Sequence, residues 1–310
     1  MYSHGGSTWA DPPTLDFSDN SNPLGPPSGL EEAVEEAGRK KTYLKFPAHL
    51  AEEVLTQYEG IRVVVFNGAT EALTAALIRL KPRRMVVPWP NYIDYLRVAH
   101  LLGVPALRAG PEEAGEGDVV VMSNPNNPLG TYLKRDEVLD LAAQLRRRGA
   151  RLLVDESFID FAGGETAAPD VPVVKSYGKL LAAPGLRVGA WLGDVPQEAA
   201  APWRINSVAD YAIYALGAEA LKKHRDKTAA YVREETPRVI KAVSRCVEAR
   251  PSDVHFFVAW GPRPAGVKVR GLESHGMPDA YRVSIKTPSL NRLLIEAICS
   301  ASRRSSPSLP

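Results

Sequence analysis

The stretch VVKSYGKLLAAPGLRVGAWLG, residues 173–193, joins two apolar runs through a short polar turn. The runs VPVV (171–174) and LRVGAWL (186–192) have the composition of buried strands, and the turn between them carries Lys179. A lysine amine placed among apolar strands costs solvation free energy unless it has a partner or forms a covalent bond. Lys179 is therefore a candidate for a chemical role, and a surface lysine in a loop is the plain alternative.

The segment from about residue 62 to residue 193 alternates short β-branched runs with helical patterns. The expected strands are 62–66, 84–88, 118–122, 151–155, 171–175 and 186–192. The expected helices are 70–80, 92–102 and 134–148. Strands that are apolar on both faces and alternate with helices predict an α/β domain, with a mostly parallel sheet between layers of helices.

The pattern changes after Asn206, where long helical stretches replace the alternation. We expect helices at 208–226 and 228–249, the second interrupted by Pro237, strands at 254–260, 266–270 and 281–285, and a closing helix at 289–304. A chain of 310 residues exceeds the usual size of a single hydrophobic core. The sequence therefore predicts an N-terminal arm (1–40) that joins a small α+β domain (206–310), and a large domain (41–205).

The composition of the chain argues against nucleic-acid binding, membrane binding and metal binding. Lys and Arg number 38 against 36 Asp and Glu, so a net charge of +2 offers no broad attraction for nucleic acid or an anionic membrane. Two cysteines, Cys246 and Cys299, give no disulfide framework and no metal spacing, and the histidines show no paired ligand spacing either. With no apolar run long enough to span a membrane, we expect a cytoplasmic protein that binds no metal.

Polar residues follow the expected strands where those strands end. In open parallel sheets, ligands bind outside the carboxyl ends of the strands. The segment Gly68-Ala69-Thr70 lies at a strand-to-helix turn, where free backbone N–H groups can hold a phosphate, although one glycine there can also be a plain turn. Ser176 and Arg187 can add a hydroxyl and a guanidinium to the same phosphate.

Three further strand-end residues have both a chemical and a structural interpretation. Asp155 ends an apolar strand, where a carboxylate can hold a pyridinium proton or serve as a turn aspartate. Asn127, in a proline-rich turn, can contact a ligand or form an Asx turn. Tyr92 can line the site or open a helix and pack in the core. The strand-end carboxylate Asp155, the lysine of the turn Ser176-x-x-Lys179 and Arg187 eight residues later have the order and spacing expected of pyridoxal phosphate enzymes.

With these motifs the chain resembles the fold type I pyridoxal-phosphate family, specifically its class I/II aminotransferase branch, from Asp16 to about Ile298. The resemblance implies pyridoxal 5'-phosphate as cofactor and Lys179, in SYGKLLAAPGLRVG, as the lysine that forms an imine with it. It also implies a role for each remaining candidate. The cofactor phosphate would be bound by Gly68, Ala69, Thr70, Ser176 and Arg187. The cofactor ring would be bound by Asp155 at its nitrogen, by Asn127 at its hydroxyl and by Tyr92 on its face. Arg282 would bind the α-carboxylate of the substrate.

Within the branch, the motifs HGG (4–6) and DFS (16–18) and the residue Phe158 resemble the threonine-phosphate decarboxylases of cobalamin biosynthesis. The motif NxNPxG at 20–25 is shared with histidinol-phosphate aminotransferases, so an aminotransferase remains the alternative. A homologue that binds the cofactor without turnover is the third. Both enzyme classes act on a phosphorylated amino acid or amine. The resemblance implies that the substrate is bound by His4, Gly5, Asn20, Asn127, Arg270 and Arg282.

Two positions depart from the family pattern. The family commonly has a tyrosine before a proline that reaches the neighbouring subunit, whereas this chain has Phe46-Pro47, with Tyr43 as a candidate substitute. Gly178 stands where a hydroxyl residue often precedes the lysine. The resemblance also implies a homodimer, with the arm and the turn near Phe46 reaching the site of the other subunit.

Overall fold

The computed structural model describes residues 5–12, 14–196 and 199–305. Its larger sheet has seven strands in the order β1-β7-β6-β5-β4-β2-β3. These strands are β1 (Val63–Asn67), β2 (Met85–Val87), β3 (Ala106–Arg108), β4 (Val119–Ser123), β5 (Arg151–Asp155), β6 (Val173–Ser176) and β7 (Val188–Leu192). β7 is antiparallel to β1 and β6, and the other neighbours pair in parallel. The expected mostly parallel sheet is confirmed.

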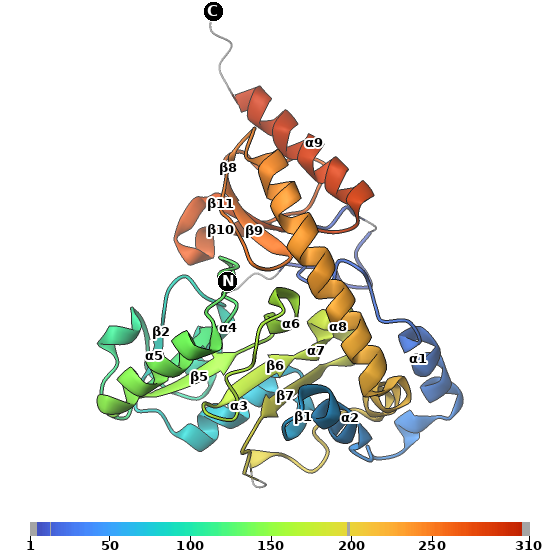
Figure 1. The fold of residues 1–310 in the computed structure, drawn as a ribbon, viewed down its shortest axis with the longest axis vertical. Helices are drawn as coiled ribbons and strands as arrows, with labels where there is room; N and C mark the ends of the chain where they lie inside the picture. The colour runs from blue at the N-terminus through green and yellow to red at the C-terminus, as the bar shows by residue number, and fades with distance from the viewer. Residues whose placement is uncertain (1–4, 13, 197–198, 306–310) are drawn as a thin grey trace, which may run out of the picture.

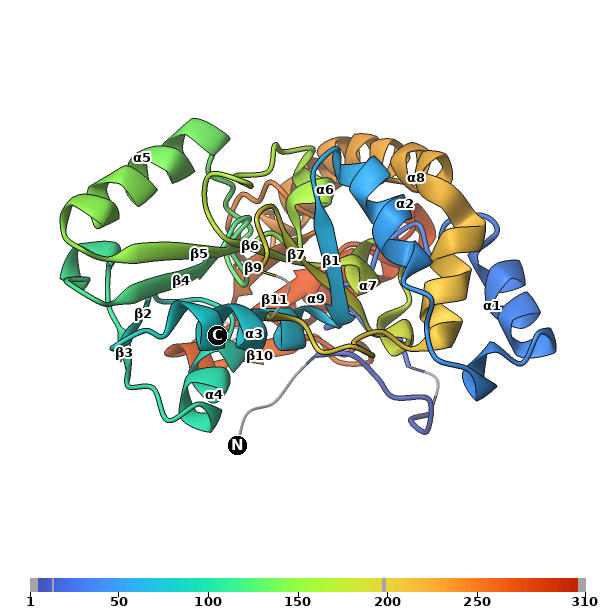
Figure 2. The same cartoon turned by 90° about the horizontal axis from the view of Figure 1, so that it is seen from below.

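Helices cover both faces of this sheet (Figure 2). Alternate side chains such as Val65, Val120 and Val154 pack with α1 (Leu30–Arg39), α2 (Leu50–Glu59), α5 (Arg135–Arg147) and the first part of α8 (Ser207–Val243). Their neighbours, such as Phe66 and Val121, pack with α3 (Ala69–Leu80) and α4 (Asp94–Leu101) on the other face. The central strands are mainly apolar because they bury both faces, whereas the edge strand β3 is largely exposed.

The long helix α8 connects the large sheet to the small one (Figure 1). Ala209 and Ile213, near its start, pack in the large core, and Val239 and Val243, near its end, pack in the small core. The expected interruption at Pro237 is wrong: Pro237 lies inside the helix, and the residue with non-helical geometry is Gly217, with φ 76°. Packing on both sides of Pro237 holds that turn in place, whereas glycine adopts a positive φ at little cost.

The smaller sheet is antiparallel, in the order β10-β11-β9-β8. Its elements are β8 (Glu248–Ala249), β9 (Phe256–Trp260), β10 (Arg270–Leu272), β11 (Met277–Ser284) and the covering helix α9 (Pro288–Ser305). The expected strand at 266–270 is wrong, because pairing within this sheet begins only at Arg270. Lys268 pairs instead with the arm, where it forms an isolated bridge to Asp16.

The arm packs against both the large sheet and the small sheet. Phe17 packs in the core of the small sheet, and its N–H donates to the carbonyl of Lys268 at 2.8 Å. Further along, Leu30 and Ala33 of α1 pack in the core of the large sheet. The described part of the arm therefore bridges the two sheets. The domain boundaries at 40 and 205 remain our proposal.

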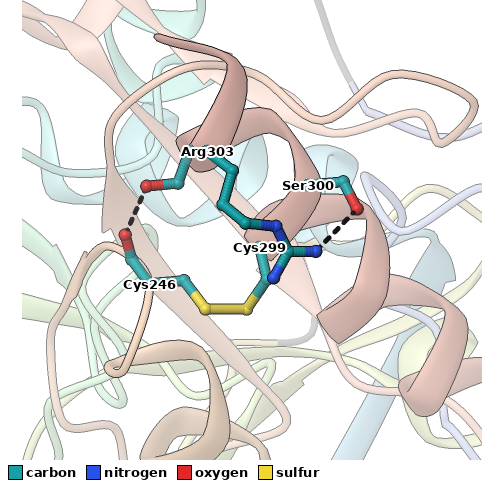
Figure 3. The surroundings of a disulfide bond; sticks show 5 residues. Cys246, Cys299, Ser300 and Arg303 are labelled. Atoms are coloured by element: carbon teal, nitrogen blue, oxygen red, sulfur yellow. Dashed lines mark hydrogen bonds between the residues drawn. A yellow bond between two sulfur atoms is a disulfide. The ribbon is translucent and has the colours of Figure 1, made fainter. Parts of the chain in front are cut away.

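A disulfide joins Cys246, in the turn after α8, to Cys299 of α9, with the Cα atoms 5.1 Å apart (Figure 3). The expectation of no disulfide is wrong. The two residues are 53 positions apart, and they meet because the ends of α8 and α9 pack in one core. Local spacing carries no signal for such a pair.

The short elements complete the chain. They are the one-turn helices α6 (Ile159–Ala162) and α7 (Tyr177–Leu180) and the 3₁₀ turns Thr42–Leu44, Pro111–Glu113, Pro184–Leu186 and Glu273–His275. In the described part of the chain, every helix is too short or too polar to cross a membrane.

Candidate active site

A cavity of about 340 Å³ opens where the carboxyl ends of β4, β5 and β6 meet the arm and the small sheet. It collects most of the residues predicted from the sequence. Those lining it are Gly5, Asn20, Ala69, Thr70, Tyr92, Asn127, Asp155, Phe158, Ser176, Lys179, Arg187, Arg270 and Arg282. Gly68 adjoins them at the turn before Ala69, and His4 lies outside the described residues.

Lys179 and Lys175 lie four residues apart in very different surroundings. Lys175 of β6 is 1 % exposed and is paired with Glu59 at 2.8 Å and Asp160 at 2.9 Å. Burial lowers the pKa of Lys175, but these two carboxylates outweigh it and hold the pKa above its usual range. Lys175 is therefore a buried ammonium group that is held in an ion cluster and has a structural role.

Lys179 instead lines the cavity from α7, the single turn that follows β6. Burial lowers the pKa of Lys179, and the cations Arg282 and Arg187 lower it further, while Asp19 opposes them. A lower pKa leaves more neutral amine, which is the nucleophilic form. Of these two neighbouring lysines, only Lys179 has the environment of a reactive amine.

The turn Gly68-Ala69-Thr70 begins α3, a helix of 12 residues, and Ala69 and Thr70 line the cavity. Gly189 of β7 lies directly beneath this turn, because a Cβ there would be 2.2 Å from the Ala69 nitrogen. Gly68 is likewise in contact with Arg187, since its Cβ would lie 2.4 Å from Nη2. The two glycines therefore let the N-terminus of α3 lie close to β7 and to the Arg187 guanidinium. With Ser176, which also lines the cavity, these groups have the chemistry of a phosphate-binding site.

Asp155 is held as an acceptor at the end of β5. Its Oδ1 accepts hydrogen bonds from the Ser157 N–H at 2.9 Å and from the Ser157 hydroxyl, and its Oδ2 accepts one from the Tyr95 hydroxyl at 2.8 Å. Burial raises the pKa of Asp155, while these bonds and Lys179 oppose the rise. Three donors favour the carboxylate form, which can hold a protonated ring nitrogen.

Asn127 and Tyr92 line the cavity beside Asp155. The Asn127 N–H donates to the Ser123 hydroxyl at 2.9 Å, and its side-chain carbonyl accepts a bond from Arg282. The Tyr92 hydroxyl donates to Asp94 at 2.9 Å, and burial with that carboxylate raises the pKa of Tyr92. Tyr92 thus keeps its proton and lines the cavity.

The end of the cavity that is formed by the small sheet is cationic. Arg270 of β10 and Arg282 of β11 are directly paired across the sheet, where like charges disfavour each other. Burial and Arg270 lower the pKa of Arg282 to about 9. Within the described residues, the buried Nε of Arg282 has no hydrogen-bond partner. This end can bind an anion, which would relieve both costs.

His275 completes this end of the cavity. It stacks on Trp89 with ring centroids 5.4 Å apart, and burial together with Arg270 and Arg282 lowers its pKa to about 4. Its imidazole is therefore neutral near pH 7 and can donate or accept one hydrogen bond without adding charge.

The arm closes one wall of the cavity. The Gly6 N–H donates to the Ser18 hydroxyl at 2.9 Å, which holds Gly5 against the site. Asn20 accepts a bond from the Ser284 hydroxyl at 2.7 Å. On the facing wall, Phe158 packs on Phe256 with centroids 4.9 Å apart and presents a phenyl ring without a hydroxyl.

Phe46 and Tyr43 lie away from the cavity. Both side chains are exposed, at 71 % and 61 %, and Phe46 stacks on Trp203 with ring centroids 4.3 Å apart. Within one chain, neither side chain lines the cavity.

Several cavity residues escaped the sequence analysis. They are Ser18, Asp19, Leu73, Ile93, Asp94, Tyr95, Ser123, Ser157 and His275. Tyr95, for example, lies on the buried face of α4, and its partner Asp155 is 60 positions away. In the sequence, Tyr95 has the spacing of an ordinary buried residue of a helix. Its position three residues after the candidate Tyr92 was the one indication of a place in the site.

The family model for aminotransferase class I and II matches residues 13–250, and the chain belongs to this family. It is a pyridoxal phosphate-dependent enzyme with the fold type I architecture. When bound, the cofactor supplies an electron sink for a bond broken at the substrate Cα. The glycine-lined turn, Asp155 and Lys179 fit its phosphate, ring nitrogen and aldehyde by their chemistry.

Individual relatives carry two different names. A histidinol-phosphate aminotransferase from Rubrobacter xylanophilus is 31% identical, over 87% of this chain and 86% of its own. A threonine-phosphate decarboxylase from Salmonella typhimurium is 29% identical, over 92% and 90%. The crystal structure of a histidinol-phosphate aminotransferase from Clostridium acetobutylicum superimposes with a TM-score of 0.80 at 19% identity, covering 94% of this chain and 99% of that one.

Proposed function

We propose that this protein is a decarboxylase that converts L-threonine O-phosphate to aminopropanol phosphate in cobalamin biosynthesis. The observation that carries the proposal is the pairing of Arg270 with Arg282 at one end of the cavity. Two adjacent guanidinium groups suit a small substrate with two anionic groups, a carboxylate and a phosphate. The relative from Salmonella typhimurium named threonine-phosphate decarboxylase supports the same substrate.

Each side chain has a defined task in this proposal. Arg282, held by Asn127 and by the Ser18 carbonyl at 2.9 Å, binds the α-carboxylate. Arg270 binds the substrate phosphate with help from the neutral His275 and the backbone of Gly5. Asn20 contacts the substrate from the arm. Asp155 keeps the ring nitrogen protonated, and Lys179 moves the proton at Cα.

The alternative is an aminotransferase of the histidinol-phosphate type, the name of the relative from Rubrobacter xylanophilus. It differs in which bond at Cα is broken: the bond to the carboxylate in the decarboxylase, and the bond to hydrogen in the aminotransferase. Phe158, which presents no hydroxyl to the cavity, favours the decarboxylase in our proposal. A homologue that binds the cofactor without turnover is the remaining option.

The test is a product assay on the purified holoenzyme. With L-threonine O-phosphate we expect release of carbon dioxide and appearance of aminopropanol phosphate in the mass spectrum. Arg270→Ala should raise KM for threonine phosphate roughly 10- to 100-fold, the cost of losing a charge-assisted contact. Absence of carbon dioxide, with conversion of an added 2-oxo acid to its amino acid, would establish the aminotransferase. Bound cofactor without either reaction would establish the inert homologue.

We also propose that the protein forms a homodimer through the exposed aromatic surface formed by Tyr43, Leu44, Phe46 and Trp203. These side chains are 56–71 % exposed, which is costly for large apolar groups that cluster on one face. Phe46→Glu should shift the mass measured by light scattering toward the monomer. A wild-type protein that is monomeric at micromolar concentration would contradict the proposal.

A further inference from the structure

Trp89 links the large sheet to the turn that carries His275. It follows β2, and its indole Nε1–H donates to the His275 carbonyl at 2.9 Å. The two rings also stack, with an interplanar angle of 18°. His275 belongs to the turn Glu273–His275 between β10 and β11. One side chain of the large domain therefore contacts this turn both at its backbone and at its ring.

The turn depends on outside contacts because the ladder of the small sheet ends before it. The last paired residues on its two sides are Leu272 and Met277, and the register shifts between Gly271 and Leu272. Residues 273–276 therefore lie beyond the ladder. Segments of this kind are mobile unless other contacts fix them. Trp89 supplies a hydrogen bond and a ring contact at this place.

The same turn is hydrogen-bonded to Arg270, the group to which we assign the substrate phosphate. Nη2 of Arg270 donates to the Ser274 hydroxyl at 3.5 Å, and that hydroxyl is hydrogen-bonded to Nδ1 of His275 at 3.2 Å. Arg270 and His275 both line the cavity. A displacement of the turn would therefore shift a cation and an imidazole relative to a bound anion.

Arg108 contacts the same indole from the edge strand β3. It pairs with Val87, two residues before Trp89, and it is exposed. Its guanidinium carbon lies 4.2 Å from the centroid of the Trp89 ring. A guanidinium at this distance forms a cation–π contact, for which tryptophan is the best partner. The edge of the large sheet thus fixes the indole, and the indole fixes His275.

We propose that Trp89 is a positioning residue for the substrate phosphate: it holds the turn Glu273–His275 so that His275 and Arg270 are in place before the anion arrives. This rests on the proposed function, which assigns the phosphate to this end of the cavity. Groups that are already ordered bind more tightly, because the ligand does not have to order them. Loss of Trp89 should therefore weaken phosphate binding and leave the bond-breaking step unchanged.

Inorganic phosphate tests this end of the cavity without turnover. In the holoenzyme we expect the cofactor phosphate to occupy the turn at Gly68, so calorimetry with inorganic phosphate measures the remaining anion site. Arg270→Ala should abolish the measured binding. Trp89→Leu removes the hydrogen bond and the ring contact and should raise the Kd about tenfold. Trp89→Phe keeps a ring for His275 and should raise the Kd only about threefold.

Arg108 offers a milder variant, because an exposed side chain can be replaced without disturbing the core. Arg108→Gln removes the cation from the indole and should raise the Kd for phosphate about two- to fivefold. Arg97→Gln removes an exposed arginine of α4 and is the matched control for the loss of charge. It should keep the wild-type Kd. Arg108→Gln and Trp89→Phe also provide the test if Trp89→Leu does not fold.

Wild-type affinity for phosphate in the Trp89 and Arg108 variants overturns the proposal. An equal loss of affinity for pyridoxal phosphate overturns it too, because that result would show general loosening of the site. Phosphate binding that survives in Arg270→Ala refutes the assigned position of the anion, and the proposal with it.

Kinetics separate positioning from catalysis. With L-threonine O-phosphate, Trp89→Leu should raise KM about tenfold at unchanged kcat, and a fall in kcat at unchanged KM would contradict the proposal. Failure of the decarboxylase proposal appears separately, as absence of carbon dioxide release from the wild type, and the phosphate titration still decides the role of Trp89.

Discussion

Gly189→Ala tests whether the phosphate-binding turn depends on the close approach of two backbones. Gly189 is paired with Phe66 of β1 and with Ser176 of β6, directly below the start of α3. A Cβ at this position would lie 2.2 Å from the Ala69 nitrogen and 2.2 Å from the Gly68 carbonyl carbon. Ordinary contact requires about 3.5 Å, so the turn must move by roughly 1 Å.

Two consequences follow from that displacement. Overpacking of this kind costs about 1–3 kcal/mol of stability, which corresponds to a fall in Tm of roughly 2–12 °C. A displaced amide donor also weakens a charge-assisted hydrogen bond worth about 1.5–3 kcal/mol. The Kd for pyridoxal phosphate should therefore rise roughly 10- to 100-fold.

The assay combines thermal unfolding of the apoprotein with titration of the cofactor followed by its absorbance. Gly178→Ala is the matched control, because a Cβ there would lie 3.5 Å from the Pro184 Cα and 3.6 Å from the Ala183 carbonyl oxygen, both ordinary contacts. It should bind the cofactor as the wild type does. A Gly189→Ala protein with wild-type affinity would refute the assigned position of the phosphate.

Three further predictions concern stability. Lys175→Met leaves two carboxylates buried without their partner and should lower the free energy of unfolding in urea by about 3–5 kcal/mol; a loss below about 1 kcal/mol would contradict a buried ion cluster. Replacing Cys246 and Cys299 by serine opens a loop of 53 positions and should cost about 4 kcal/mol in the same assay; dithiothreitol should then leave the variant unchanged while destabilising the wild type. Burial lowers the pKa of His255 to about 3, so its stabilising effect is present above about pH 6.5 and is lost as the pH falls toward 3. His255→Gln should flatten the acid side of the Tm profile, whereas the exposed control His100→Gln should not, and parallel profiles for wild type and His255→Gln would be evidence against this.

Much of the large sheet was predictable because its strands bury both faces. Apolar runs such as 119–122 and 152–154 are typical of buried parallel strands, and a polar residue at the end of such a run, such as Asp155, predicts the ligand-binding edge of the sheet. The antiparallel orientation of β7 was not predictable in this way, because the pattern of buried residues in a strand is the same for either direction.

Other features depend on contacts between distant segments. Lys268 pairs with Asp16 of the arm and not with the small sheet, although the sequence around it is typical of an ordinary strand. The non-helical residue of α8 is Gly217 and not Pro237. Glycine and proline both disfavour a helix, and the packing around each one determines where the helix is interrupted. Asp19 lines the cavity from the arm, and His275 lines it from the small sheet. Because both segments are far in sequence from the large sheet, no local motif predicts these two residues.

The central claim is that pyridoxal phosphate is bound covalently by Lys179 inside this cavity. The direct measurement is borohydride reduction of the purified protein after incubation with pyridoxal phosphate, followed by peptide mass spectrometry. The account predicts a single cofactor-modified residue, Lys179, and no modification in a Lys179→Ala variant. Modification of the neighbouring Lys175, or equal labelling of surface lysines with Lys179 unmodified, would contradict it.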